Sequence, residues 1–253
     1  MLAAERRNEI LALLKEEGKV IVADLSKKYS VTEETIRRDL EKIEGDGFAE
    51  RTYGGAVLKE NDKEDLPFLV RKRVNVEAKK RIAATIAEMI QDGERIMLDN
   101  STTALFVAKE IRSKKNMTVI TNSIEILLEL SDVKDWRVFA TGGTLRAGSL
   151  AFVGYQAERM VDEYYVDKAI LSCKGVDYHK GFTDSNELDA GIKKQMFKAA
   201  ATKIMAVDSG KFGRISFTRI EGFTDVDVVV TDYEMDEDWT EKMQDCNVKV
   251  VKC

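Results

Sequence analysis

Short polar segments that follow apolar runs are the parts of this 253-residue sequence best suited to bind a small charged molecule. Serine, threonine and asparagine side chains at the start of a helix, together with the unpaired backbone N–H groups there, bind phosphate. Glycine allows a close backbone approach, and a cation adds the charge that a phosphate attracts. Four segments have this composition: Asp99 to Thr103, Thr121 to Ser123, Gly142 to Arg146 and Asp208 to Lys211.

Together, the four segments predict a binding site for a phosphorylated polyol. A single segment is weak evidence, because such side chains cap a helix more often than they contact a ligand. The interpretation therefore depends on the segments lying side by side. In that case, we expect the following ligand contacts: Asn100, Ser101, Thr102, Thr103, Thr121, Asn122, Ser123, Gly142, Gly143, Thr144 and Lys211.

Two adjacent arginines near the N-terminus form a second pattern. The segment Val31 to Ile36 predicts a helix start, with Thr32 as the N-cap and glutamates in the positive first turn. An apolar stripe then recurs at helical spacing, which leaves the opposite face, with Arg38, free to meet a partner. We expect DNA contacts from this helix and from the hairpin after it: Thr32, Glu34, Thr35, Arg37, Arg38, Lys42 and Arg51.

The net charge does not by itself favour nucleic-acid binding. The formal charge of the chain is -5, and residues 1–58 hold ten basic and twelve acidic side chains, a net of -2. Positive charge must therefore be concentrated by geometry, with Arg6 or Arg7 of the first helix as further contributors. A solvated helix face and a protein–protein adaptor are the alternatives that this charge balance leaves open.

The elements that would position these residues differ between the two halves of the chain. The first half predicts three helices, Arg6 to Lys15, Ala23 to Tyr29 and Thr32 to Lys42, with Gly18 ending the first. Phe48 to Val57 then predicts a hairpin, whose turn at Gly54-Gly55 we expect to use positive φ. The first half therefore predicts a small winged helix-turn-helix.

The second half alternates short apolar strands with amphipathic helices, which predicts an α/β domain with a mostly parallel sheet covered by helices. Ligands of such sheets bind at the carboxyl ends of the strands, where all four polar segments fall. The predicted strands are Arg95 to Leu98, Met117 to Ile120, Arg137 to Ala140, Val166 to Leu171, Ile204 to Val207, Val226 to Val230 and Val248 to Val251.

A domain boundary is expected beside Pro67, which follows the charge-dense stretch Lys59 to Asp65. We predict a DNA-binding domain over residues 1–58, a linker over 59–74 and an effector domain over 75–253. No apolar stretch approaches the ~18 residues that span a bilayer. The N-terminus has no signal-peptide pattern, so we expect a cytoplasmic protein.

Cysteine and histidine usage argues against several kinds of chemistry. The three cysteines form no CxxC pair, and His179 is the single histidine, so we expect no disulfide framework, no metal site and no cofactor. An aldose–ketose isomerase is the enzymatic alternative, with Asp99, Asp208 and Glu187 as available bases. Regulation by ligand binding is the favoured interpretation, and we do not expect an enzyme.

The strings Thr35-Ile36-Arg37-Arg38-Asp39-Leu40 and Arg51-Thr52-Tyr53-Gly54-Gly55-Ala56 resemble the winged helix-turn-helix of DeoR-type regulators. Downstream, Phe68 to Arg71, Gly142-Gly143 and Asp208 to Gly213 are similar to the effector domain of that family. The resemblance implies a sugar-phosphate sensor with a fold similar to ribose-5-phosphate isomerase, and a dimer or tetramer that represses a sugar operon by binding operator DNA.

The resemblance also implies further effector contacts at Arg71 and Lys79. The sequence departs from the family pattern in two places. It has Asp99-Asn100-Ser101 where the family more often has Asp-Ala-Gly, and Asp208-Ser209-Gly210 where the family more often has Asp-Ser-Ser. The identity of the sugar phosphate is therefore left open.

Overall fold

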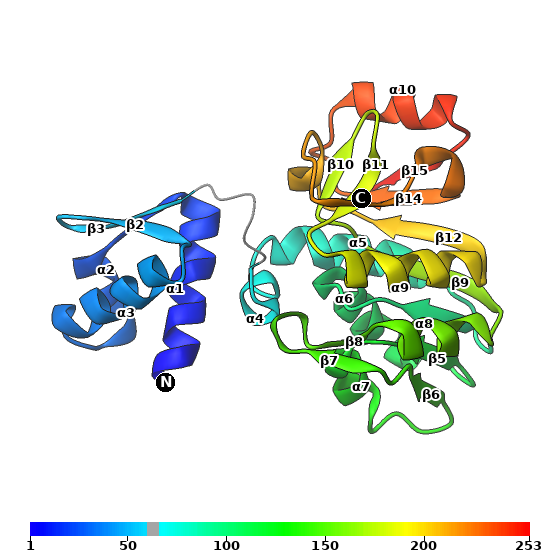
Figure 1. Cartoon of the computed structure of the whole chain (residues 1–253), viewed down its shortest axis with the longest axis horizontal. Helices are drawn as coiled ribbons and strands as arrows, with labels where there is room; N and C mark the ends of the chain where they lie inside the picture. Colours follow the sequence, from blue (N-terminus) through cyan, green and yellow to red (C-terminus); the bar gives the residue numbers. More distant parts are fainter. Residues whose placement is uncertain (60–65) are drawn as a thin grey trace. The chain divides into compact units, whose positions relative to one another are not determined.

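The computed structural model of the chain describes residues 1–59 and 66–253 (Figure 1). It divides into two compact units, Met1–Val76 and Glu77–Cys253. In the first unit, three helices and a fourth, one-turn helix accompany a three-stranded antiparallel sheet of order β1-β3-β2. Its elements are α1 (Ala3–Glu17), β1 (Lys19–Ile21), α2 (Val22–Tyr29), α3 (Glu33–Gly45), β2 (Ala49–Thr52), β3 (Gly55–Leu58) and α4 (Phe68–Arg71).

The core of the first unit is built from the apolar stripes of its helices, with Ile10, Leu14, Ile36 and Leu40 at most 1% exposed. Gly18 ends α1 as predicted, because it takes φ 74° and donates its N–H to Leu14 O. The prediction of a winged helix-turn-helix in the first half is therefore confirmed, and its helices begin and end near the predicted residues.

The wing differs from the prediction at its turn, because neither Gly54 nor Gly55 has a positive φ. Gly55 is needed for another reason. A Cβ built on Gly55 would lie 1.9 Å from Val20 O, whereas a Cβ on Gly54 would meet nothing within 4 Å. Gly55 therefore allows β1 to approach β3 closely, and the expectation of positive φ at these two glycines was wrong.

Residues 66–74, which we placed in a linker, contribute structure to the N-terminal unit. Helix α4 begins after Pro67, and Val70 is fully buried in the same apolar cluster as Ile10 and Leu40. Apolar side chains at Leu66, Val70 and Val74 explain this packing, since their burial is favourable. Residues 60–65 of the predicted linker lie outside the described residues.

The second unit contains a seven-stranded sheet in which every neighbouring pair is parallel, with the order β15-β14-β12-β9-β4-β5-β6. All seven predicted strands are present, close to their expected bounds. They are β4 (Arg95–Leu98), β5 (Thr118–Thr121), β6 (Arg137–Ala140), β9 (Val166–Leu171), β12 (Ala200–Ala206), β14 (Val228–Thr231) and β15 (Lys249–Lys252).

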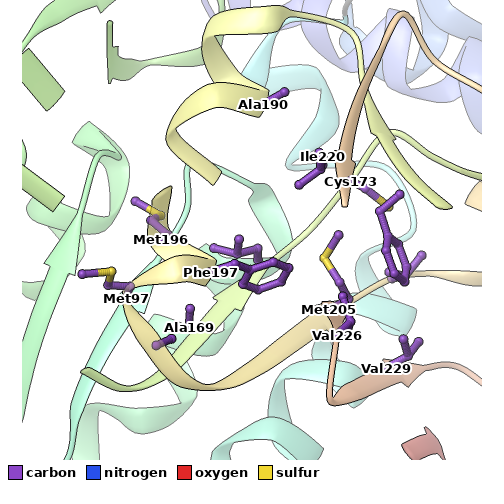
Figure 2. Packing of buried hydrophobic residues seen from close by; sticks show 14 of the residues in the cluster. Met97, Ala169, Cys173, Ala190, Met196, Phe197, Met205, Ile220, Val226 and Val229 are labelled. Atoms are coloured by element: carbon purple, nitrogen blue, oxygen red, sulfur yellow. The ribbon is translucent and has the colours of Figure 1, made fainter. Parts of the chain in front are cut away.

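Helices flank this sheet, as the strand–helix alternation predicted (Figure 1). They are α5 (Val76–Glu88), α6 (Thr102–Glu110), α7 (Ile124–Leu130), α8 (Tyr155–Asp162), α9 (Glu187–Lys198) and α10 (Glu237–Asp245). Figure 2 shows the apolar core, in which Met97, Ala169 and Met205 of the sheet lie near Met196 and Phe197 of α9. The fold class is therefore α/β, with a small winged domain before it.

Five further strands form two antiparallel sheets that the sequence analysis did not predict. Each has only three or four residues, and several carry polar side chains, so no apolar run marks them. The first sheet is a hairpin of β7 (Thr144–Arg146) and β8 (Ala151–Val153). The second has the order β10-β11-β13, from β10 (Gly175–Asp177), β11 (Gly181–Asp184) and β13 (Thr218–Glu221).

The strand order places a topological switch point between β4 and β9. From β4 the chain proceeds through β5 to β6 on one side, and from β9 through β12, β14 and β15 on the other. Loops diverge at such a point, which is where ligands bind in open parallel sheets. The carboxyl ends of β4 and β9, at Asp99 and Ser172, are therefore the centre of the candidate ligand site.

Candidate functional site

Helix α3 presents one buried and one exposed face, as its apolar stripe predicted. Thr32 caps the helix by accepting from Thr35 N at 3.2 Å, which confirms the predicted N-cap. Ile36, Leu40 and Ile43 are at most 3% exposed. The other predicted contacts on α3 face outward except for the half-buried Thr35, namely Glu34, Arg37, Arg38 and Lys42.

The three arginines predicted to contact DNA each pair with a glutamate at the surface. Arg37 lies 2.8 Å from Glu33, and Arg38 lies 3.3 Å from Glu34. Exposed pairs one helical turn apart contribute about 0.3–0.5 kcal/mol each, so little is lost when a competing anion takes the arginine. These pairs orient the guanidinium groups without holding them tightly.

Arg51 connects the wing to the end of α3. Its backbone N–H donates to Glu44 Oε1 at 2.9 Å, and its Nε donates to Glu44 Oε2 at 2.8 Å. These two donors hold the pKa of the Glu44 carboxyl below its usual value. Arg51 of the wing is thereby placed next to the exposed face of the helix, although the two lie on different elements.

Arg6 is buried in an ion pair and is not available to an exposed positive surface, which corrects our expectation for this residue. Its side chain is 9% exposed, and its Nε lies 2.6 Å from Asp39 Oδ2 on the inner side of α3. Arg7 is more exposed and lies 3.5 Å from the same carboxylate. Arg6 and Asp39 therefore position the helix, a role that the sequence analysis missed for both residues.

The polar segments of the second unit gather at the carboxyl ends of adjacent strands. Leu98 of β4 pairs with Thr121 of β5, and Thr121 pairs with Ala140 of β6. The segments after β4 and β5 are buried, with Asn100 4% and Asn122 0% exposed, whereas most of the segment after β6 is exposed. Three of the four predicted segments are thus neighbours along one edge of the sheet.

Two serines in these segments cap helices, which is the commoner role of such side chains at a helix start. Ser101 Oγ accepts from Ala104 N at 3.0 Å, and Ser123 Oγ accepts from Ile126 N at 3.3 Å. Among the described residues, the backbone N–H groups of Thr102 and Thr103 have no acceptor. The first turn of α6 therefore combines a cap with unpaired donors, the arrangement that attracts an anion.

Glycines bring the β6–β7 segment close to its neighbours. Gly142 and Gly143 have φ 63° and 106°, and a Cβ on Gly143 would lie 2.8 Å from Val153 O. A side chain is therefore excluded at Gly143 by both conformation and space. Thr144, the next predicted contact, is exposed at the start of β7.

Lys211 reaches the switch point from the far side, after β12. Its Nζ donates to Ser172 Oγ at 3.0 Å and lies 3.1 Å from Asp208 Oδ2. Its side chain is 21% exposed, so the ammonium is partly accessible. Since Ser172 N donates to Asp99 Oδ2 at 3.0 Å, the fourth predicted segment joins the first through Ser172.

A buried lysine, Lys193 of α9, lies beneath this edge and was not predicted. Its Nζ lies 2.5 Å from Asp184 Oδ2 and 3.2 Å from Asp99 Oδ2, and donates to Ser172 O at 2.9 Å. Burial opposes the charge, but the carboxylates of Asp184, Asp99 and Asp189 outweigh it and raise the pKa of Lys193. Lys193 therefore stays an ammonium that joins α9 to the ends of β4 and β9.

Asp189 of α9 is the second residue that the sequence analysis missed. Its Oδ1 accepts from Asn100 Nδ2 at 3.1 Å, and its Oδ2 accepts from Arg146 Nη1 at 2.6 Å. The spacing of Asp189 and Lys193, four residues apart on one predicted helix, was the available signal that both face the same way. No local sequence pattern indicated which strands this face of α9 would contact.

Two residues that the family resemblance implies as effector contacts lie outside the four polar segments of the sequence. Arg71 is on α4 of the N-terminal unit, where its Nε donates to Leu66 O at 3.0 Å. Lys79 is on α5 and only 4% exposed, so its ammonium is held inside the second unit. Both stay predictions as effector contacts.

Cys173, directly after Ser172, is a core residue. Burial raises the pKa of its thiol to about 12, so the reactive thiolate form is scarce at neutral pH. Within residues 1–59 and 66–253, no group of three or more histidine, cysteine or acidic side chains is arranged to hold a metal ion. Across the same residues, no helix is long and apolar enough to span a membrane.

Comparison with known proteins gives matches to both units. A family model described as a DeoR-like helix-turn-helix domain matches residues 6–62, and one described as a DeoR C terminal sensor domain matches residues 74–233. The HTH-type transcriptional regulator YulB of Bacillus subtilis (strain 168) is 42% identical over 250 residues, which cover 99% of this chain and 96% of that protein.

A second relative is the putative aga operon transcriptional repressor of Escherichia coli O157:H7, which is 32% identical over 98% of this chain and 93% of its own length. Among solved structures, ribose 5-phosphate isomerase A from Methanocaldococcus jannaschii overlaps with a TM-score of 0.41 and 17% identity, over 55% of each chain. An overlap of this size does not extend the chemistry of the isomerase to this chain.

Proposed function

Because the chain belongs to the DeoR family of transcriptional regulators, we propose that it represses a carbohydrate-utilisation operon under the control of a phosphorylated sugar. Family membership makes it a DNA-binding regulator and not an enzyme. The observation that carries the proposal is the exposed face of α3, with Arg37 and Arg38 opposite the buried stripe. The name of the aga operon repressor supports both repression and a sugar operon.

In the proposed complex, α3 enters the major groove of operator DNA. Its N-terminal residues would approach the base edges, as in other helix-turn-helix proteins, and its flanks would contact phosphates. We assign Thr32, Glu34, Thr35 and Arg38 to the base edges. Phosphate contacts are assigned to Arg37, Lys42 and the wing residue Arg51.

Surface ion pairs make this assignment compatible with the net charge of -2 over residues 1–58. A phosphate competes with Glu33 for Arg37 and with Glu44 for Arg51, and each exchange replaces one anion by another. Because exposed pairs are weak, the exchange costs little. Release of counterions from DNA then favours binding, with a strength that falls as the salt concentration rises.

The effector is proposed to bind at the carboxyl edge around the switch point. The unpaired N–H groups of Thr102 and Thr103 and the ammonium of Lys211 supply donors and charge for a phosphate. Asn100, Ser101, Thr121, Asn122, Ser123, Gly142, Gly143 and Thr144 complete the proposed contacts. Arg71 and Lys79 are retained as secondary contacts on the basis of family resemblance alone.

We further propose that the regulator acts in the cytoplasm as a homodimer or homotetramer, since two-fold symmetric assemblies match the two half-sites of a palindromic operator. A ligand changes an equilibrium only through its different affinity for the two states. The sugar phosphate must therefore favour one arrangement of the sensor units over the other, and so change how well the DNA-binding units fit the two half-sites.

The DNA assignment is tested with an operator selected from a random duplex library by the full-length protein. Replacement of one base-contacting arginine, Arg38→Ala, is expected to weaken operator binding by roughly ten- to a hundredfold. Arg159→Ala, an exposed arginine of the second unit, is the control and should change little. Unchanged operator affinity for Arg38→Ala contradicts the assignment of the helix.

The effector assignment is tested with a thermal-shift screen of sugar phosphates, followed by footprinting with the best hit. Lys211→Ala is expected to keep operator binding and lose the response to the sugar phosphate. Lys249→Ala, an exposed lysine of β15, is the matched control. A full effector response in Lys211→Ala removes Lys211 from the site, and steady turnover of a sugar phosphate by the purified protein contradicts regulation without catalysis.

A further inference from the structure

Asp189 divides its carboxylate between two segments of the proposed effector site. One oxygen holds the amide of Asn100 at 3.1 Å, and the other holds the guanidinium of Arg146 at 2.6 Å. The side chain of Asp189 is 4% exposed, whereas that of Arg146 is 25% exposed. A buried carboxylate thus anchors a cation that is partly open to solvent.

Arg146 is linked in this way to the first turn of α6. Asn100 directly precedes Ser101, the N-cap of that nine-residue helix. The amide of Asn100 is oriented by Asp189, because the reverse orientation would set its carbonyl oxygen against a carboxylate oxygen. Its Oδ1 is then left buried without a hydrogen-bond partner among the described residues.

A buried acceptor without a partner is costly, and a ligand hydroxyl would satisfy it. The same is true of Asn122, whose Nδ2 donates to Phe152 O at 3.0 Å while its Oδ1 is buried without a partner among the residues described. A site for a phosphorylated polyol needs donors for the phosphate and partners for the hydroxyls. The first turn of α6 supplies the donors, and Asn100 and Asn122 supply acceptors for the hydroxyls.

A guanidinium binds phosphate through paired hydrogen bonds, and a phosphate monoester carries more charge than a carboxylate. We propose that Arg146 is a phosphate-binding residue of the effector site, and that Asp189 holds it in place while the site is empty. On binding, Arg146 exchanges Asp189 for the phosphate. This inference rests on the proposed function, because it assumes a sugar phosphate at this edge.

The exchange would act on the hairpin that carries Arg146. Arg146 ends β7, and Ala151 of β8 bridges to Ser123 at the start of α7. Phe152 of β8 also donates its N–H to Asn122 O at 2.8 Å. The hairpin is therefore attached to the effector segment Thr121 to Ser123. Its position is the structural difference that a bound phosphate would select.

The experiment measures the binding of glucose 6-phosphate, ribose 5-phosphate and fructose 6-phosphate to full-length protein by calorimetry, with the free sugars as controls. Arg146→Gln should weaken binding of the phosphorylated ligand at least tenfold, and Arg146→Lys should fall between it and the wild type. Asp189→Asn, which removes the competing charge, should tighten binding severalfold. The double variant should behave like Arg146→Gln.

Asp167→Asn is the control, because Asp167 also pairs with an arginine, Arg95, but at an exposed position at the amino ends of β4 and β9, away from the proposed site. It should leave phosphate binding unchanged. Equal affinity of wild type and Arg146→Gln overturns the role of Arg146, and weaker binding in Asp189→Asn overturns the exchange. A wild type that binds a phosphate as tightly as Arg146→Gln does refutes only the role of Arg146, whereas a wild type that binds no sugar phosphate, here or in the thermal-shift screen, contradicts the proposed function itself.

Arg146 is partly exposed, so its variants should fold even if Asp189→Asn does not. Far-UV circular dichroism and the melting temperature of each variant establish this. If Asp189→Asn is unfolded, the comparison of Arg146→Gln with Arg146→Lys alone decides the proposal. Weaker binding in Arg146→Gln than in Arg146→Lys, with both below the wild type, supports the role of Arg146, and wild-type binding by both variants contradicts it.

Discussion

Asp39 on α3 accepts a hydrogen bond from Arg6 on α1 at 2.6 Å, and the two side chains are only 5% and 9% exposed. The helix that we assign to the major groove is therefore held against α1 by a buried ion pair as well as by its apolar stripe. Arg37 and Arg38, the two residues before Asp39, face outward on the same turn. The pair thus sets the angle at which both arginines are presented.

Removal of one partner from this pair should destabilise the N-terminal unit. Asp39→Ala leaves the Arg6 cation buried without its carboxylate, which typically costs about 3–5 kcal/mol. We expect its urea unfolding midpoint to fall and operator binding to weaken, while effector binding by the second unit persists. Asp24→Ala, an exposed carboxylate on α2, is the control. Unfolding at the wild-type midpoint would show that the pair contributes little.

The two wing glycines should respond differently to the same substitution. Gly55→Ala would place a Cβ 1.9 Å from Val20 O, so β1 and β3 would have to separate. Gly54→Ala meets nothing within 4 Å and needs no positive φ. We expect Gly55→Ala to lower the melting temperature of the N-terminal unit by several degrees and to abolish operator binding, with Gly54→Ala close to wild type. Equal behaviour of the two variants would contradict the close approach.

Glu44 should restrain non-specific binding to DNA through Arg51. Glu44→Gln and Glu50→Gln each remove one negative charge from the exposed surface of the wing unit, but only Glu44 pairs with Arg51. We expect Glu44→Gln to bind random-sequence duplex DNA severalfold more tightly than Glu50→Gln. A plot of the logarithm of its affinity against the logarithm of the salt concentration should also be steeper, by the amount that about one additional phosphate contact gives. Equal affinities would mean that net charge alone acts.

Asp184 should make stability depend on pH in the acid range. Burial favours its neutral form, but the nearby Lys193 and Lys174 outweigh burial and hold the pKa of Asp184 below its usual value. A lowered folded-state pKa adds stability above the unfolded value of about 3.9, and this stability is lost as the pH falls through the folded value.

The measurement compares melting temperatures of wild type and Asp184→Asn between pH 3 and 7. The difference should be full above about pH 5 and should shrink below about pH 4, where the wild-type carboxylate becomes protonated. Asp135→Asn, at an exposed position, serves as the control. A difference that stays constant across the range would show that the charge of Asp184 is not the source of its contribution.

Local patterns in the sequence were enough to predict most elements. The seven strands of the large sheet are short apolar runs, and β4, β6 and β9 have the predicted bounds. The short antiparallel strands escaped prediction because three or four mixed residues carry no distinct period. Gly55 was recognised as special for the wrong reason, since its constraint comes from Val20, 35 positions earlier, and not from its own φ.

The sequence alone determined which segments carry phosphate-binding chemistry, because helix caps, glycines and strand ends are local features. Only the tertiary structure showed that Asn100 meets Asp189, 89 residues away, and that Arg146 meets the same carboxylate from a hairpin. It also showed that Lys193 lies among the carboxylates at the ends of β4 and β9. Such contacts depend on strand order and on which face of α9 packs inward, and long-range packing of this kind leaves no local pattern.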